Sequence, residues 1–145
     1  KRSIKKATGA GKFDQLVAGG QPAGITVKNN LLKECMEEAS ISNKLVKTSV
    51  PVGTISYLTT RKEGLRNDTL FCFDLLLPEN FQPYNTDGEV ECFYLWSLEK
   101  VAYIIENTTN FKFNSVLVVI DFLIRHGFIN PDNQDYINII NELNS

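Results

Sequence analysis

The sequence contains a single histidine, His126, and this scarcity excludes every site that needs two or more imidazole groups. The residue follows an apolar run and precedes Gly127, a setting typical of a helix C-terminus. We therefore expect a structural role for it, with contact to an anionic ligand as the alternative. A serine or cysteine hydrolase would depend on this one imidazole, and its sequence neighbours give no support for such a site.

Cysteine is also scarce: the three residues Cys35, Cys72 and Cys92 are odd in number and show no CxxC spacing. This usage predicts reduced thiols in the core of a cytoplasmic protein. The first residue is Lys1 rather than methionine, so we expect a segment ahead of it. An organelle would be the location if that segment carries a transit peptide.

No hydrophobic run is long enough to span a bilayer, because residues 115–124 are too few and include Asp121. Fifteen basic and seventeen acidic residues give a net charge of −2. The chain therefore lacks the excess of positive charge that is typical of a nucleic-acid-binding protein. The basic opening, residues 1–6, is expected to be solvated. A length of 145 residues with 43% hydrophobic residues is typical of one globular domain over 1–145.

Hydrophobic periodicity predicts strands and helices intermixed around one core, which is an α/β domain. Strands are expected over residues 50–57 and 69–77, joined by a charged link, and a further alternating strand over 89–96. Thr26 is expected to cap a helix with Leu31, Leu32, Cys35, Met36 and Ala39 on its apolar side. Later helices are expected from Ser97 to about Glu106, from Asn114 or Ser115 to near Gly127, and from Asp132.

Three carboxylates, Glu34, Glu37 and Glu38, share one narrow strip of the helix that follows Thr26, at about 100° per residue. Like charges at this spacing destabilise a helix by a few tenths of a kcal/mol. This observation alone is compatible with two interpretations of the three glutamates, a solvated helix face and a ligand site.

A glycine-rich turn precedes that helix, with Gly19, Gly20 and Gly24 in the first six positions. Bare backbone of this kind lets carbonyls and amides approach a metal or a phosphate closely. Clustered carboxylates together with a carbonyl are oxygen ligands that suit Mg²⁺ or Mn²⁺ rather than zinc. Turn and helix together predict a site for metal-bound phosphates, with Gly19 and Gly20 near the substrate.

Residues 19–41 resemble the Nudix box, GX5EX7REUXEEXGU, without insertion or deletion. Gly19 takes the place of the first glycine, and Lys33-Glu-Cys-Met-Glu-Glu38 takes the place of the acidic core. The sequence departs from the box at Ile25, Lys33 and Ser40, and lysine lacks the bidentate fork of the arginine. These departures keep open a binding module that retains the fold without hydrolysis.

The resemblance extends over nearly the whole chain to thiamine pyrophosphokinase-related Nudix hydrolases. It is carried by phrases such as Asp14-Gln-Leu-Val-Ala-Gly-Gly-Gln-Pro-Ala-Gly24, Asn85-Thr-Asp-Gly-Glu-Val-Glu91 and Ile120-Asp-Phe-Leu-Ile-Arg-His-Gly127. It implies a Nudix fold, a mixed β-sheet sandwiched between α-helices. Members of that family carry a further N-terminal region, so residues 1–145 are expected to be the C-terminal part of a longer protein.

The implied activity is metal-dependent hydrolysis of thiamine diphosphate, or of its oxidised analogues, to the monophosphate and phosphate. ADP-ribose, nucleotide sugars and nucleotides are the alternative substrates. The partner would be a small-molecule diphosphate, with no nucleic-acid polymer and no membrane, and the oligomeric state stays open, a homodimer included.

The resemblance also implies roles for individual residues. Glu34, Glu37 and Glu38 would hold Mg²⁺ or Mn²⁺, and Glu34 or Glu38 would orient or deprotonate water. The Ala18 carbonyl would be a main-chain metal ligand. Glu89 would be a remote ligand or base with Glu91 behind it, although an exposed strand carboxylate is the simpler interpretation.

Substrate contacts are expected from Arg66, Lys112 and Asn114, although an exposed pair of Arg66 with Asp68 and a simple helix cap at residues 112–114 are the alternatives. Asp87 or Glu89 could sense a charged ring. Aromatic walls are expected from Tyr57, Phe71, Phe81, Tyr84 and Phe113, whereas Phe93 and Trp96 are expected in the core rather than as a stacking platform.

Overall fold

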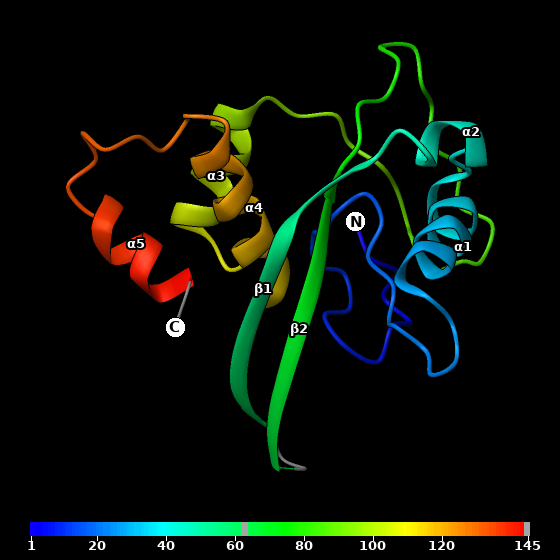
Figure 1. The fold of residues 1–145 in the computed structure, drawn as a ribbon, viewed down its shortest axis with the longest axis horizontal. Helices are drawn as coiled ribbons and strands as arrows, with labels where there is room; N and C mark the ends of the chain where they lie inside the picture. Colours follow the sequence, from blue (N-terminus) through cyan, green and yellow to red (C-terminus); the bar gives the residue numbers. More distant parts are fainter. Residues whose placement is uncertain (62–63, 144–145) are drawn as a thin grey trace.

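A long β-hairpin stands between two groups of helices in the computed structural model, which describes residues 1–61 and 64–143 (Figure 1). The hairpin consists of β1 (Val50–Arg61) and β2 (Gly64–Asp74). On one side lie α1 (Val27–Ala39) and α2 (Asn43–Val46), and on the other lie α3 (Leu98–Asn107), α4 (Phe113–Arg125) and α5 (Tyr136–Leu143).

The hairpin is antiparallel and runs from the pair Val50↔Asp74 to the pair Arg61↔Gly64, with an irregularity between Pro51 and Gly53. Both predicted strands exist, but their bounds were wrong. The strands continue into the charged link, because cross-strand polar pairs fit the pleat as well as apolar ones do. Residues 62–63 of that link lie outside the described residues. The second strand ends at Asp74, so residues 75–77 leave the sheet.

Isolated bridges connect the rest of the chain. Arg2 bridges Val90 in the antiparallel sense and Phe13 bridges Phe111 in the parallel sense, so the pairing is mixed. Val90 is the one bridging residue between 89 and 96, where a strand was predicted. The alternation there does not bury one face, since Tyr94, on the same face as Val90 and Cys92, is 54% exposed. The α/β class is confirmed, and the described arrangement is compatible with a Nudix fold, whereas a full sheet sandwich stays a prediction.

The predicted helices form with shifted ends. Thr26 caps α1, its side chain accepting from the Asn29 amide at 3.2 Å, and Ser97 caps α3 in the same way. The third predicted helix begins at Phe113, ahead of both expected starts, Asn114 and Ser115. The last helix begins at Tyr136 rather than Asp132, and the short α2 was not predicted.

The main cluster of buried residues lies where α1 meets α2, and Ile41, between these helices, is 1% exposed. Met36 was predicted on the apolar side of α1 but is 44% exposed, so the prediction was wrong for this residue. The buried members of the cluster are Cys35, Ala39, Ile41 and Val46, with Val17, Leu31, Leu32, Leu45, Leu75, Leu77, Phe81 and Phe93 packed against them.

All three thiols are free, as predicted. Cys35 and Cys72 are buried, and burial raises the pKa of both thiols, that of Cys35 to about 11. Cys92 is only half-buried, so the expected core position was wrong for it.

His126 is the C-cap of α4, as expected for a structural role. Its ring stacks on Phe122 with centroids 4.0 Å apart, and its Nε2 lies 3.3 Å from Asp74 Oδ2. Arg125 binds the same carboxylate with two nitrogens at 2.6 and 3.1 Å. This contact fixes the end of β2 to the end of α4.

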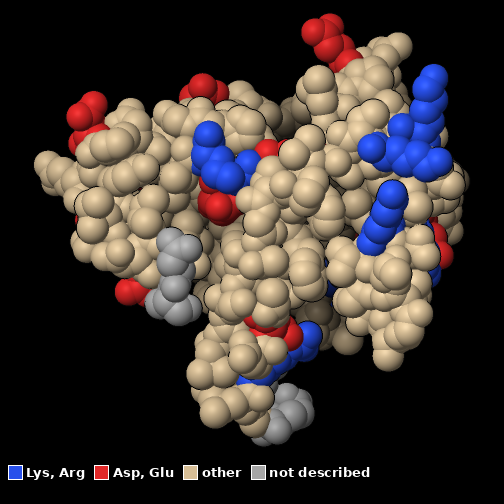
Figure 2. All heavy atoms as spheres, in the orientation of Figure 1, with Lys and Arg blue, Asp and Glu red and all other residues tan. Residues whose placement is uncertain are grey.

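No helix among residues 1–61 and 64–143 is long and apolar enough to cross a membrane. Charged side chains of both signs are spread over the face of the molecule drawn in Figure 2.

Candidate functional site

A loop from the middle of the chain is attached to the C-terminal end of α1. Thr86 donates two hydrogen bonds to the Glu37 carbonyl, from its amide at 3.0 Å and from its hydroxyl at 2.8 Å. The Asn85 side-chain amide donates to the Glu38 carbonyl at 3.4 Å. The last carbonyls of a helix have no partner within the helix, so this loop satisfies groups that would otherwise be orphaned. The loop therefore has a fixed position beside the glutamates of α1.

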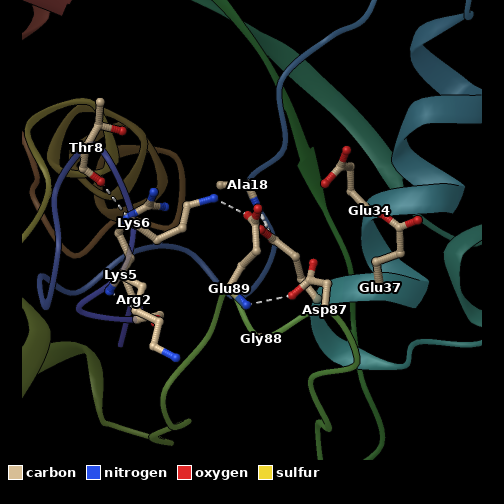
Figure 3. Close-up of polar contacts among 12 residues, drawn as sticks. Arg2, Lys5, Lys6, Thr8, Ala18, Glu34, Glu37, Asp87, Gly88 and Glu89 are labelled. Atoms are coloured by element: carbon tan, nitrogen blue, oxygen red, sulfur yellow. Dashed lines mark hydrogen bonds and ion pairs between the residues drawn. The ribbon is translucent and has the colours of Figure 1, made fainter.

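The same loop presents Asp87 and Glu89. Asp87 Oδ1 accepts from the Asn85 side chain at 2.6 Å and from the Glu89 amide at 2.8 Å, which closes a tight turn. The Glu89 carboxylate forms an ion pair with Lys6. Figure 3 shows Glu89 between Lys6 and the α1 glutamates, so the predicted remote acid is near the helix but is turned to a lysine.

Glu34 packs directly against the first glycine of the turn. A Cβ atom added to Gly19 would lie 2.0 Å from Glu34 Cδ, so only glycine leaves room for this side chain. Lys33 Nζ lies 3.1 Å from a Glu34 oxygen and 3.0 Å from a Glu37 oxygen. The hydrogen bonds that Lys33 donates, first to Glu37 and then to Glu34, raise the pKa of Lys33. Lys33 therefore contacts one oxygen of each of the two carboxylates.

Glu38 is the buried acid of the site, with 5% of the residue exposed. Its Oε2 accepts from the Ala18 amide at 2.7 Å. Burial raises the pKa of Glu38 to about 7, although the hydrogen bond from Ala18 opposes the shift, and the nearby carboxylates of Glu34, Asp14 and Asp87 raise it further. A carboxyl group that titrates near neutral pH is suited to accept a proton from water.

The donors around the turn fit a hard divalent cation in their chemistry, since Glu34, Glu38 and the Ala18 carbonyl offer oxygen atoms only. The space over Gly19, which a Cβ would fill, belongs to the Glu34 carboxylate. Within the part of the chain that the structure describes, however, no three His, Cys, Asp or Glu side chains converge closely enough to hold a metal ion. Glu37 is paired with Lys33.

The N-terminal segment is engaged with the site, and this corrects, for Arg2 and Lys6, the expectation that its charges are solvated; Lys5 is exposed as expected. Arg2 is 8% exposed, and its Nη1 lies 2.5 Å from Asp14 Oδ2. Asp14 also accepts a hydrogen bond from the Ser115 hydroxyl. Sequence reasoning missed these contacts because the Asp14 and Ser115 pair is separated by 101 positions, and no local pattern marks such a pair.

Lys112 and Asn114 lie at the start of α4. Lys112 is the N-cap without a side-chain cap hydrogen bond, so the simple cap that was preferred does not form there. Its Nζ lies 3.4 Å from Asp14 Oδ2, beside the buried ion pair. Asn114 Oδ1 is buried without a hydrogen-bond partner among the described residues.

Arg66 and Asp68 form an exposed pair on β2, with Arg66 Nε 2.7 Å from Asp68 Oδ2. Tyr57 of β1 donates to the same Asp68 carboxylate at 2.8 Å. The contacts made by Arg66 are therefore within the hairpin, in agreement with the alternative of an exposed pair, although that pair is on a strand rather than in a loop.

A cavity of about 250 Å³ opens beside Glu38 and Ala18. We call it the aromatic cavity, because its walls include the rings of Phe13, Phe93, Tyr94, Trp96 and Phe111. Phe93 packs against the core, as expected, and also reaches this cavity. Trp96, expected in the core, is part of the cavity wall instead.

The aromatic walls that were predicted lie elsewhere. Tyr57 and Phe113 line a second hollow of about 760 Å³ between β1, α4 and α5. Phe71 and Tyr84 are exposed, and Phe81 packs against the core. The sequence offered no signal for the rings of the aromatic cavity, because aromatic residues serve core and ligand sites alike.

Comparison with known proteins agrees with the box. The chain is 49% identical over 143 residues to Nudix hydrolase 20, chloroplastic, and 47% identical over 143 residues to Nudix hydrolase 24, chloroplastic, both of Arabidopsis thaliana. The chain is similar to Nudix hydrolases from end to end. These matches cover 99% of the chain, but 38% and 39% of the two Nudix hydrolases.

A third relative, an uncharacterized protein of Saccharomyces cerevisiae, is 31% identical over 156 residues, which cover 99% of this chain and 45% of that protein. No family model matches the chain.

The departures from the Nudix box now have structural contexts. Ser40 has a φ of 53°, in the left-handed region where glycine is favoured, and its hydroxyl donates to the Tyr84 carbonyl at 2.8 Å. Ile25, in place of the first box glutamate, is half-buried, and its carbonyl accepts from the Gln21 side chain at 2.6 Å. Asn30 is buried and donates to the Gly20 carbonyl at 3.0 Å, so it ties the turn to α1.

Proposed function

We propose that the chain is a metal-dependent Nudix-type hydrolase that cleaves the diphosphate bond of a small organic diphosphate. The observation that carries this proposal is the junction of the glycine-rich turn with α1. There Glu34 fills the space over Gly19, and the buried Glu38 reaches back to the Ala18 amide. The 49% and 47% identity to two Nudix hydrolases, over 99% of the chain, supports the same activity.

Mg²⁺ or Mn²⁺ would be held by Glu34, Glu37, Glu38 and the Ala18 carbonyl, with Glu89 as a further ligand from the loop beside α1; binding would require Lys33 to release Glu34 and Glu37. When bound, such an ion neutralises diphosphate charge and lowers the pKa of a coordinated water. The residues of the chain would contribute by positioning the substrate and by stabilising the charge of the transition state.

Glu38 is our choice for the group that takes the proton from the attacking water, because it is the buried carboxylate at the junction of the turn with α1, where its Oε2 accepts from the Ala18 amide. The water oxygen forms a bond to phosphorus, and the bond from that phosphorus to the bridging oxygen breaks. The products are phosphate and a monophosphate ester. Lys33 keeps the carboxylates of Glu34 and Glu37 oriented until substrate arrives.

For the substrate we propose thiamine diphosphate or its oxidised analogues. The support is the resemblance of residues 14–24, 85–91 and 120–127 to thiamine pyrophosphokinase-related Nudix hydrolases. Residues 85–89 are also the loop that is attached to the end of α1, so this part of the resemblance lies at the proposed site.

The test is release of phosphate or monophosphate products with Mg²⁺ from thiamine diphosphate, its oxo and oxy analogues, ADP-ribose and nucleoside triphosphates. We expect the highest kcat/KM for a thiamine compound, and a loss of about 10² to 10⁴-fold in Glu38→Gln, the range for removing a general base. Glu106→Gln, an exposed α3 glutamate, is the matched control and should match wild type.

Equal rates in wild type and Glu38→Gln would refute the role of Glu38, and equal rates in Glu37→Gln as well would refute the hydrolase assignment. A ten-fold preference for ADP-ribose or a triphosphate would replace the thiamine substrate. Diphosphate binding that requires Mg²⁺, measured by calorimetry with no product over hours, would identify a non-hydrolysing module.

We propose an organelle or the cytoplasm as the location. Both named plant relatives are described as chloroplastic, which supports an organelle.

A further inference from the structure

We propose that the aromatic cavity binds the aromatic ring of the organic group that the diphosphate carries. This inference rests on the proposed function in one respect: it takes the end of the cavity at Glu38 and Ala18 as the diphosphate end. The ring would lie against Tyr94 and Trp96, which are far in sequence from the box.

The rings of the cavity form an ordered wall. Tyr94 and Trp96 stack with centroids 5.0 Å apart and an interplanar angle of 27°. Phe13 meets both edge-on, at 4.8 Å from Trp96 and 5.9 Å from Tyr94. Tyr94 is 54% exposed despite these contacts. Part of its aromatic surface is therefore accessible to a ligand. Planar rings bind to such surfaces by stacking.

Apart from Glu38, the charged side chains in the lining of the cavity are paired. Arg2 and Asp14 form an ion pair in its lining, and Glu89 is paired with Lys6. Apart from Glu38, and from Lys100, whose Nζ lies 4.5 Å from the Trp96 ring centroid, a ligand that enters this wall meets apolar ring faces. This setting selects for an aromatic group and gives little to a purely polar one.

The size of the cavity sets the size of the ring. A cavity of about 150 Å³ holds benzene, and the aromatic cavity has about 250 Å³. It therefore has room for one ring with its substituents. Because Glu38 and Ala18 line the same cavity, a ring held there would be close to a diphosphate at the α1 turn.

The experiment measures binding by fluorescence, since Trp96 is the only tryptophan of the chain and lines the cavity. The 145-residue chain without divalent metal is titrated with thiamine monophosphate, phenyl phosphate and n-butyl phosphate. Thiamine monophosphate and phenyl phosphate should change the Trp96 emission to saturation. The ringless n-butyl phosphate should bind at least ten-fold more weakly than phenyl phosphate.

Tyr94→Ala should raise the Kd for phenyl phosphate about ten-fold, within the range for removal of a stacking partner. Tyr103→Ala, which removes a tyrosine that is 64% exposed on α3, is the matched control and should leave the Kd unchanged. Circular dichroism verifies that both variants fold. Equal Kd values for phenyl and n-butyl phosphate, or an unchanged Kd in Tyr94→Ala, would overturn the inference.

Failure of the proposed function has a different signature. If no diphosphate is hydrolysed but phenyl phosphate still binds through Tyr94, the cavity inference stands and the hydrolase proposal fails. If thiamine diphosphate is hydrolysed with the same KM in wild type and Tyr94→Ala, the hydrolase stands and the cavity inference fails.

Discussion

Replacement of Gly19 by alanine tests the junction of turn and helix directly. The added Cβ would lie 2.0 Å from Cδ, 2.3 Å from Cγ and 2.3 Å from Oε2 of Glu34. Carbon atoms in contact prefer separations of about 3.5–4.0 Å, so the Glu34 side chain has to leave its position. Gly19 is not among the glycines with positive φ, so the requirement for glycine is one of space rather than of backbone conformation.

The expected loss of stability is about 1–3 kcal/mol, the usual range for overpacking a well-packed place. It should be in the lower part of that range, because Glu34 is a flexible side chain that can turn toward solvent. The loss of hydrolysis should be far larger, since the displaced carboxylate is a proposed metal ligand. Urea denaturation and phosphate release from thiamine diphosphate measure the two effects separately.

A double-mutant cycle with Glu34→Ala decides whether the clash is the cause. With the Glu34 side chain removed, the alanine at position 19 meets none of the three atoms that surround it, so Gly19→Ala should lower neither stability nor residual activity further. The reasoning is refuted if Gly19→Ala has wild-type activity, or if it destabilises the protein equally in both backgrounds.

Two further predictions concern the ends of helices. Ser40→Gly should be more stable than Ser40→Ala by about 1–2 kcal/mol in urea denaturation, because both lose the hydroxyl contact but only glycine relieves the left-handed strain; equal stability would contradict this. Arg125 lowers the pKa of Asp74. At pH values above the usual aspartate pKa, this pair should therefore stabilise the fold by about 0.2–1 kcal/mol. That contribution should be lost as the pH falls through the lowered pKa of Asp74. The difference in free energy of unfolding between wild type and Asp74→Asn should therefore shrink from pH 7 to pH 3, and a constant difference would show that the ion pair contributes nothing.

The sequence predicted the α1 region best, because every signal for it is local. Thr26 and its partner are three positions apart, and the glutamates repeat along a single helix. The aromatic cavity could not be predicted, because its lining joins Phe13 to Trp96 across most of the chain. The strand over residues 89–96 was mispredicted for a related reason: alternation records residue types, but burial depends on which elements pack against each face.

The attachment of the N-terminal segment has a consequence for the order of folding. Asp14 meets Ser115, and Lys6 meets Glu89, across separations of 101 and 83 positions. Contacts between residues so distant along the chain require the closure of long loops and form slowly compared with helical turns. During synthesis α1 and α2 can pack against each other before α4 has been made. Residues 1–18 cannot yet form their contacts with α4 at that stage. We therefore expect the contacts around Glu38 to form last. A folding intermediate would then contain α1 with its glutamates but would not yet catalyse hydrolysis.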